Sequence, residues 1–272
     1  MNSGASSSVS LRRAARGRHR FYRQLFVVMA GQMVIMSLPW SFHRFATVGS
    51  GLMLLLLLTQ LGRRQLAAFS FGSTSTWLYR CLGAAGIAAL LGWLFTSTQK
   101  PWSGLLLLVV VASFVFWSLM RLLVLLRQEE QITSSVLAGA IAGYLMLGIT
   151  GGLILSVLET LQPGSFVDLV ASHRGSAVVH SHRMTDMVSG QVWDLDFSRL
   201  NYFAFVSITT VGYGDIVPVR RLAQMACISL SIVGPLYIAI VMGLLISRYT
   251  VQTQQAEELE DELEEEQQRS SS

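Results

Sequence analysis

Long apolar stretches alternate with short polar ones along most of the chain. Each stretch is about 20 residues long, which is the length a helix needs to cross ~30 Å of hydrocarbon. The stretches are residues 24–42, 45–61, 78–97, 103–126, 135–158 and 222–247. The second is the shortest, although it contains an unbroken run of leucines, Leu54–Leu58. A buried helix of a soluble protein could explain one such stretch, but six predict an all-α membrane protein with six transmembrane helices per subunit.

The charge distribution predicts how the chain is oriented in the membrane. Only 13% of the residues are charged, about half the share in soluble proteins. The first 128 residues contain thirteen Lys or Arg and no Asp or Glu, and the arginines cluster before the first stretch. Because basic segments stay in the cytoplasm, the N-terminus is expected inside, and six crossings return the C-terminus to the same side. The basic arm thus indicates orientation and contact with anionic lipid headgroups, not nucleic acid.

One hexad near the C-terminal end carries a specific chemistry. Residues Thr210–Asp215 read Thr-Val-Gly-Tyr-Gly-Asp. Backbone carbonyls of such a run can form stacked rings that replace the water shell of a potassium ion. Stacked carbonyls need alternating backbone conformations, and Gly212 and Gly214 reach positive φ without a Cβ penalty. The alternative is an ordinary glycine turn with these letters by chance, which the flanking apolar stretches disfavour.

With this hexad and its flanks, the chain resembles the potassium channel family over about its last 115 residues. The resemblance implies an outer helix at 135–158, a re-entrant pore helix at 199–209, the filter, and an inner helix at 222–247. In that family four copies surround one pore, so a homotetramer is expected. The permeant ion would be K⁺, which would flow passively. No enzymatic step, other cofactor or small-molecule substrate is expected.

The resemblance also implies roles for individual residues. Thr210, Val211, Gly212 and Tyr213 would coordinate dehydrated K⁺, while Gly214 and Asp215 would shape the outer mouth. Tyr202 and Phe203 stand where related channels carry aromatic residues that support the filter. Some relatives have a carboxylate four residues before the filter threonine, where this chain has Val206. Support for Asp215 is therefore expected from another residue, with Tyr202 as the candidate.

Two further features of the pore region give local predictions. Asp196 or Ser198 could cap the N-terminus of the pore helix. In the inner helix, Gly234 stands at the usual hinge glycine of the family. Pro235 removes an N–H and clashes with the carbonyl of Ser231, so a kink is expected there. A gating hinge and a static bend are both open. The outer helix contains five glycines, which are expected to pack on the inner helix: Gly139, Gly143, Gly148, Gly151 and Gly152.

The four N-terminal stretches match a voltage sensor in number only. A sensor needs several arginines at three-residue spacing in its fourth span and acidic partners in the membrane. Here the fourth stretch has Arg121 near its inner end, and no acidic residue occurs in the four stretches. Strong voltage gating is therefore not expected. A structural or regulatory collar, residues 24–130, is predicted instead.

The two remaining polar segments, the outer loop and the C-terminal tail, are predicted to be exposed to solvent. The outer loop, 159–198, carries His173, His180 and His182, for which a metal or proton-sensing site is the less favoured interpretation. The acidic tail has too short an apolar seam for a coiled coil. The chain thus divides into a cytoplasmic basic N-terminus (1–23), a four-helix membrane domain (24–130), a pore domain (131–249) and an acidic cytoplasmic tail (250–272).

Three other functions compete with a potassium channel. A poorly selective cation channel is possible because the hexad does not fix its own support. A non-conducting subunit could use the same fold for assembly. A potassium transporter is disfavoured, since related transporters carry four filter-like loops and this chain has one. The brevity of the chain and its lack of cytosolic domains favour a plasma or bacterial inner membrane.

Overall fold

The computed structural model describes residues 3–36, 43–64, 73–95, 101–129, 132–169 and 191–271. The N-terminal helices are α1 (Ser3–Met36), α2 (His43–Arg64), α3 (Ser73–Phe95), α4 (Pro101–Arg127) and α5 (Ser134–Leu161). The pore-region elements are β1 (Phe166–Asp168), α7 (Gln191–Ile208), β2 (Ile216–Pro218), α8 (Arg221–Tyr237), the π-helical turn η3 (Ile238–Met242) and α9 (Gly243–Ser271). Each predicted apolar stretch lies mainly on a helix.

Within the described residues, three helices are long and apolar enough to cross a membrane. They are Leu105–Arg127, Ser134–Leu161 and Arg221–Gln255. The last of these runs through α8, η3 and α9. A shorter apolar helix covers Gly49–Gly62. The protein is therefore a helical membrane protein, and six crossings remain a prediction.

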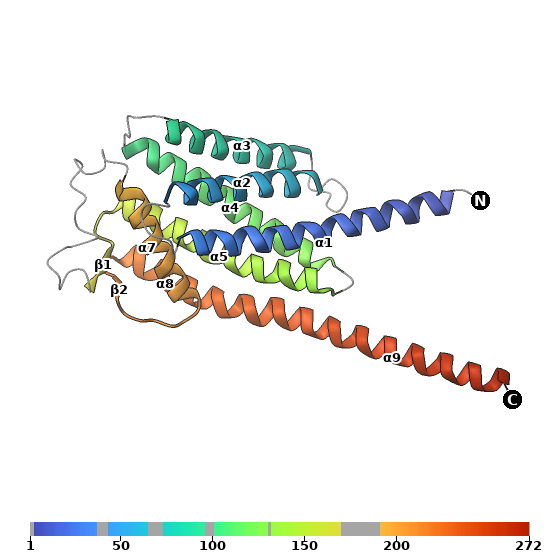
Figure 1. Cartoon of the computed structure of the whole chain (residues 1–272). Helices are drawn as coiled ribbons and strands as arrows, with labels where there is room; N and C mark the ends of the chain where they lie inside the picture. The colour runs from blue at the N-terminus through green and yellow to red at the C-terminus, as the bar shows by residue number, and fades with distance from the viewer. Residues whose placement is uncertain are drawn as a thin grey trace.

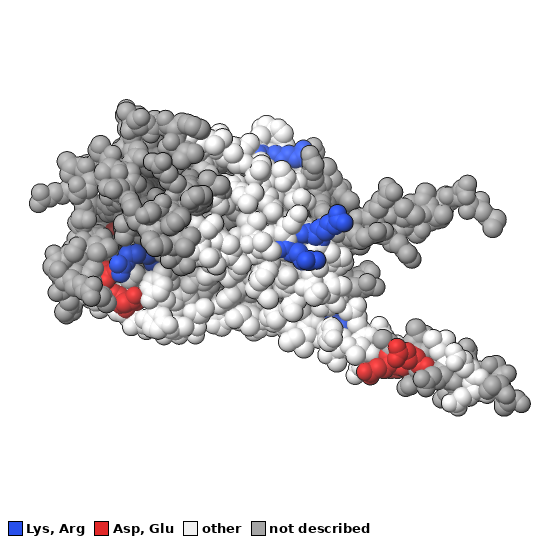
Figure 2. Space-filling view, in the orientation of Figure 1, with Lys and Arg blue, Asp and Glu red and all other residues white. Residues whose placement is uncertain are grey.

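The helices lie side by side in one elongated bundle (Figure 1). β1, β2 and the start of α8 lie at one end, and both chain termini lie at the other. On the face drawn in Figure 2, the middle of the molecule is free of charge and the described Lys, Arg, Asp and Glu gather toward the two ends. An uncharged band between charged ends is the surface expected for a bundle that spans a bilayer.

One core joins the N-terminal helices to α5. Tyr22 and Leu25 of α1, Phe114 of α4 and Ala142 of α5 are all fully buried in it. The ring of Tyr22 lies where a Cβ of Gly139 would be, so α1 and α5 approach closely at this glycine. Of the N-terminal helices, α1 and α4 thus pack directly on the outer helix of the pore region, while α2 and α3 pack mainly on α1, α4 and each other.

The glycines of α5 lie against several different helices, so the prediction that they all pack on the inner helix is wrong. Only Gly143 and Gly151 face the inner helix, opposite Tyr237 and Leu230. Glycines four residues apart lie on the same face of a helix and let another helix approach closely. This spacing does not show which helix approaches.

Two other glycines of α5 allow the pore helix to approach closely instead. A Cβ at Gly148 would overlap the ring of Phe205, and one at Gly152 would meet the backbone and side chain of Asn201. Both partners belong to α7, which therefore lies directly on α5. A second core forms beyond this contact, where Leu155, Phe166, Ile208 and Leu230 are buried together.

Candidate ion-conduction site

The hexad Thr210–Asp215 leaves the C-terminal end of α7 as an extended segment. Its start is held by the helix, because the Thr210 N–H donates to Ser207 (3.1 Å) and the Val211 N–H donates to Val206 (3.1 Å). The side chains of Val211 and Tyr213 are 51% and 70% exposed in the single chain. The segment is therefore anchored at its base and open along one side.

The backbone of this segment alternates in conformation. Thr210, Gly212 and Gly214 have φ of 57°, 61° and 75°, in the left-handed region. Thr210 is the one non-glycine residue with positive φ within the described part of the chain. When left-handed residues alternate with residues of negative φ, successive carbonyls turn toward the same side. In an ordinary extended strand, successive carbonyls point to opposite sides. A row of carbonyl oxygens on one side is the arrangement that a dehydrated cation requires.

The outer end of the hexad is tied to the segment that follows α5. β2 pairs antiparallel with β1, with Val167 opposite Val217 and Asp168 opposite Ile216. The next N–H, from Leu169, donates to the carbonyl of Asp215 at 2.8 Å. Asp215, the last residue of the hexad, is thus hydrogen-bonded to the strand pair, which holds the outer end of the hexad in place.

This ladder is positioned by Glu159, near the end of α5. Its buried carboxylate accepts hydrogen bonds from the backbone N–H groups of Gly164 (2.8 Å), Ser165 (2.9 Å) and Phe166 (3.2 Å). Gly164 has φ of 79°, which lets the chain turn back around the carboxylate. Charge-assisted hydrogen bonds to several amides are stronger than neutral ones, so this turn is well held.

A salt bridge connects α7 to β1 at the outer end of the hexad. Arg199 pairs with the buried carboxylate of Asp168 in β1. Tyr202, which is 41% exposed, lies near Asp215. Phe203 points elsewhere, into the second core, where its ring lies edge-on to that of Phe166 at 5.7 Å. The two aromatic residues predicted to support the filter therefore occupy different environments.

The start of the pore helix differs from the prediction. α7 begins at Gln191, so positions 196 and 198 lie inside the helix and neither is its N-cap position. No Gly or Pro interrupts residues 191–198, and Gly190 precedes them, so the helix can continue back to that glycine.

The inner helix meets the base of the filter at Gly234. A Cβ there would overlap the carbonyl of Ile208, the last residue of α7. That carbonyl also accepts a hydrogen bond from Tyr144 at 3.2 Å. On the next turn, the hydroxyl of Tyr237 donates to the carbonyl of Ala140 at 2.7 Å. Gly234 is therefore a contact point between two backbones, and tyrosines from α5 and α8 hold the helices on either side.

The inner helix is irregular just after Pro235. The helix continues through the proline, with the Ile238 N–H shared between the carbonyls of Gly234 and Pro235. It then widens into the π-helical turn η3 before α9 begins. Proline removes one backbone donor, and π-turns are a common way to absorb such a change within a helix.

The support of the outer mouth was not predicted from the sequence, and Glu159, Asp168 and Arg199 were not expected to be site residues. A buried Glu followed at five residues by Gly is a weak signal, and nothing local links Asp168 to Arg199. His173, His180 and His182 lie outside the described residues. Within the described part of the chain, no group of three or more His, Cys, Asp or Glu could hold a metal.

Arg121 of α4 is buried without a carboxylate beside it among the described residues. Its guanidinium lies 3.8 Å from the ring centroid of Tyr79 and 5.4 Å from that of Trp117. It also donates to the carbonyl of Ser75 at 3.2 Å. Aromatic faces and one carbonyl hold this arginine in place, an arrangement that differs from a ladder of arginines and acids.

Comparison with known proteins identifies the class of domain. Residues 144–251 match a family model described as an ion channel. The match begins in α5, contains the hexad and ends in α9. No curated protein and no solved structure matches the chain. The match supports an ion-channel domain within a membrane protein.

Proposed function

We propose that this protein is a potassium-selective channel in which four copies surround one pore and K⁺ flows passively. The observation that carries the proposal is the hexad itself, with positive φ at alternate residues and hydrogen bonds that hold it at both ends. Thr210, Val211, Gly212 and Tyr213 supply the oxygen rings. Gly214 and Asp215 form the outer mouth.

A homotetramer accounts for the exposed inner helix. Only 22% of its apolar window is buried within one chain, against 67% for α5. In lipid, apolar exposure alone does not require a partner. The filter gives the stronger reason, since one hexad supplies a quarter of each ring and needs three more copies. The inner helix would then line the pore below the filter.

The N-terminal helices are proposed to act as a collar without steep voltage dependence. Their one buried arginine described here, Arg121, is held by aromatic rings. Gly234 and Pro235 are proposed as the region where the inner helix bends. The termini are proposed to be cytoplasmic, in a plasma or bacterial inner membrane.

Ion flux into liposomes tests the proposal. Reconstituted wild-type protein should pass K⁺, and reversal potentials in mixed K⁺ and Na⁺ should follow K⁺. Gly212→Ala should abolish the flux, since a Cβ at φ of 61° strains the ring. Gly31→Ala is the matched control, because its Cβ would meet nothing within 4 Å. Equal Na⁺ and K⁺ flux would favour the poorly selective channel, and no flux from a correctly assembled protein would favour the silent subunit.

A further inference from the structure

Helices α1 and α2 touch at one end and separate toward the other. The amide of Gln32 donates to Ser50 at 3.0 Å. A Cβ at Gly49 would overlap the side chain of Gln32, so the helices approach closely here because position 49 is glycine. The chain reverses between the helices, so the N-terminal part of α1 lies beside the C-terminal part of α2.

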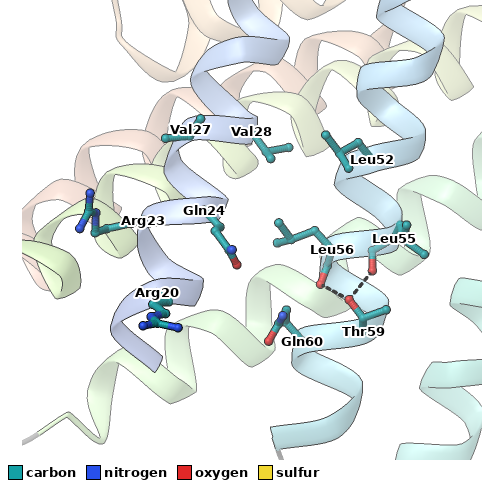
Figure 3. Close-up of a pocket in the computed structure, with 10 residues that line it drawn as sticks. All are labelled: Arg20, Arg23, Gln24, Val27, Val28, Leu52, Leu55, Leu56, Thr59 and Gln60. Carbon is teal, nitrogen blue, oxygen red and sulfur yellow. Dashed lines mark hydrogen bonds between the residues drawn. The ribbon is translucent and has the colours of Figure 1, made fainter. Parts of the chain in front are cut away.

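A groove opens where the helices separate. It has a volume of about 610 Å³ and is lined by residues from 20 to 28 of α1 and from 52 to 60 of α2 (Figure 3). Eight residues of helix extend about 12 Å, at ~1.5 Å per residue. A groove of this size is within the usual range for a bound small molecule.

The two ends of the groove differ in chemistry. Val27, Val28 and Leu52 lie at one end, and Arg20, Thr59 and Gln60 lie at the other (Figure 3). The apolar wall is open, since Val27, Leu52 and Leu55 are 66%, 52% and 50% exposed. In a membrane this wall faces hydrocarbon.

The polar end carries two arginines that can bind an anion. Arg20 and Arg23 are exposed and three residues apart, so they are neighbours on the helix surface. Within the described residues, no carboxylate pairs with either of them. His19, the residue before Arg20, contacts Thr133 just before α5 begins, so the arginines lie near the start of the candidate membrane span Ser134–Leu161.

We propose that this groove binds one anionic phospholipid of the leaflet that faces the chain termini. The phosphate would lie on Arg20 and Arg23, whose guanidinium groups match its geometry. One acyl chain would lie along Val27, Leu52 and Leu55. Free phosphate would leave this open apolar wall uncovered, so a lipid fits the whole groove. The proposal concerns binding and does not depend on whether the pore conducts.

Lipid binding to the full-length protein in detergent tests the proposal. Native mass spectrometry during titration should show tighter binding of phosphatidylglycerol than of phosphatidylcholine. Arg20→Gln with Arg23→Gln should weaken phosphatidylglycerol binding by about 30-fold, since each arginine near an anionic lipid is worth about 1 kcal/mol. Arg12→Gln with Arg13→Gln is the matched control, as it removes the same charge from the same N-terminal segment and should change binding by less than about threefold.

A second variant tests the apolar wall separately. Leu52→Trp fills the groove at an exposed position without changing charge. It should weaken phosphatidylglycerol binding by about tenfold while the melting temperature stays the same. Inorganic phosphate should not displace the lipid. Equal losses in the two arginine pairs, unchanged binding to Leu52→Trp, or displacement by inorganic phosphate would each overturn the proposal.

Discussion

At the residue scale, Tyr202 lies near Asp215 at the outer end of the hexad. Val206, where some relatives have an acid, is buried in α7. That Tyr202 supports Asp215 in place of this acid remains a prediction.

Tyr202→Phe keeps the ring and removes the hydroxyl that is predicted to donate a hydrogen bond to Asp215. We expect the steady-state K⁺ flux to fall by about tenfold, since a hydrogen bond to a charged group is worth roughly 1.5 kcal/mol or more. The measurement is flux into liposomes, with assembly checked by size-exclusion chromatography. Tyr249→Phe, at an exposed tyrosine of α9, is the control. Equal flux in both variants would mean that Tyr202 does not support the filter.

The other supports of the filter could not be predicted from the sequence. Arg199 and Asp168 are 31 positions apart, and the contact between them depends on how β1 is placed. Glu159 acts through backbone amides, which have no signature in the sequence. The hexad could be recognised from the sequence because its six residues are consecutive. The residues that hold its outer end come from chain segments that only folding brings together.

At the scale of elements, the six apolar stretches were predictable because each helix must be apolar over its own length. The ends of the helices and the helices that pack against each other could not be predicted. α7 begins before its predicted caps, and the α5 glycines face α1, α7 and α8 in turn. Gly234 shows the same ambiguity. The resemblance implies a hinge glycine there, with a gating hinge and a static bend both open, whereas the structure gives a packing reason for glycine. Gly234→Ala would therefore disturb the contact with α7 whether or not the helix bends.

Pro235→Ala is the cleaner test of the inner helix. Alanine supplies the N–H that the Ser231 carbonyl needs as a partner. Pro235 is exposed in the single chain, so no packing within the chain is lost. If the irregular turn lets the helix bend, the open probability in single-channel recordings should change by severalfold. Gly243→Ala, whose Cβ would meet nothing within 4 Å, is the matched control for greater helix stability. The same open probability in Pro235→Ala and wild type would identify a static bend.

At the scale of the whole molecule, two helices, α1 and α9, meet at the segment between α4 and α5. The hydroxyl of Tyr22 in α1 donates to the carboxylate of Glu129 at 2.9 Å. From the inner helix, Arg248 donates to the carbonyl of the same Glu129, and Gln252 accepts the N–H of Ile132 at 2.9 Å. This junction, formed by Tyr22, Glu129, Ile132, Arg248 and Gln252, connects the collar to the inner helix below the filter.

A junction of this kind gives the collar a physical route to the pore, and a double-mutant cycle can measure it. Tyr22→Phe and Arg248→Gln each remove one bond to Glu129, so the two effects on thermal stability should not add, with a coupling of at least about 0.5 kcal/mol. Both variants should also shift the open probability in the same direction. Tyr22→Phe loosens the α4–α5 segment from α1, and Arg248→Gln loosens the same segment from α9. Tyr22→Phe with Tyr249→Phe is the control pair, since Tyr249 is exposed. Additive effects in the first pair would mean that the collar and the inner helix are held independently, and the four N-terminal helices would then be structural only.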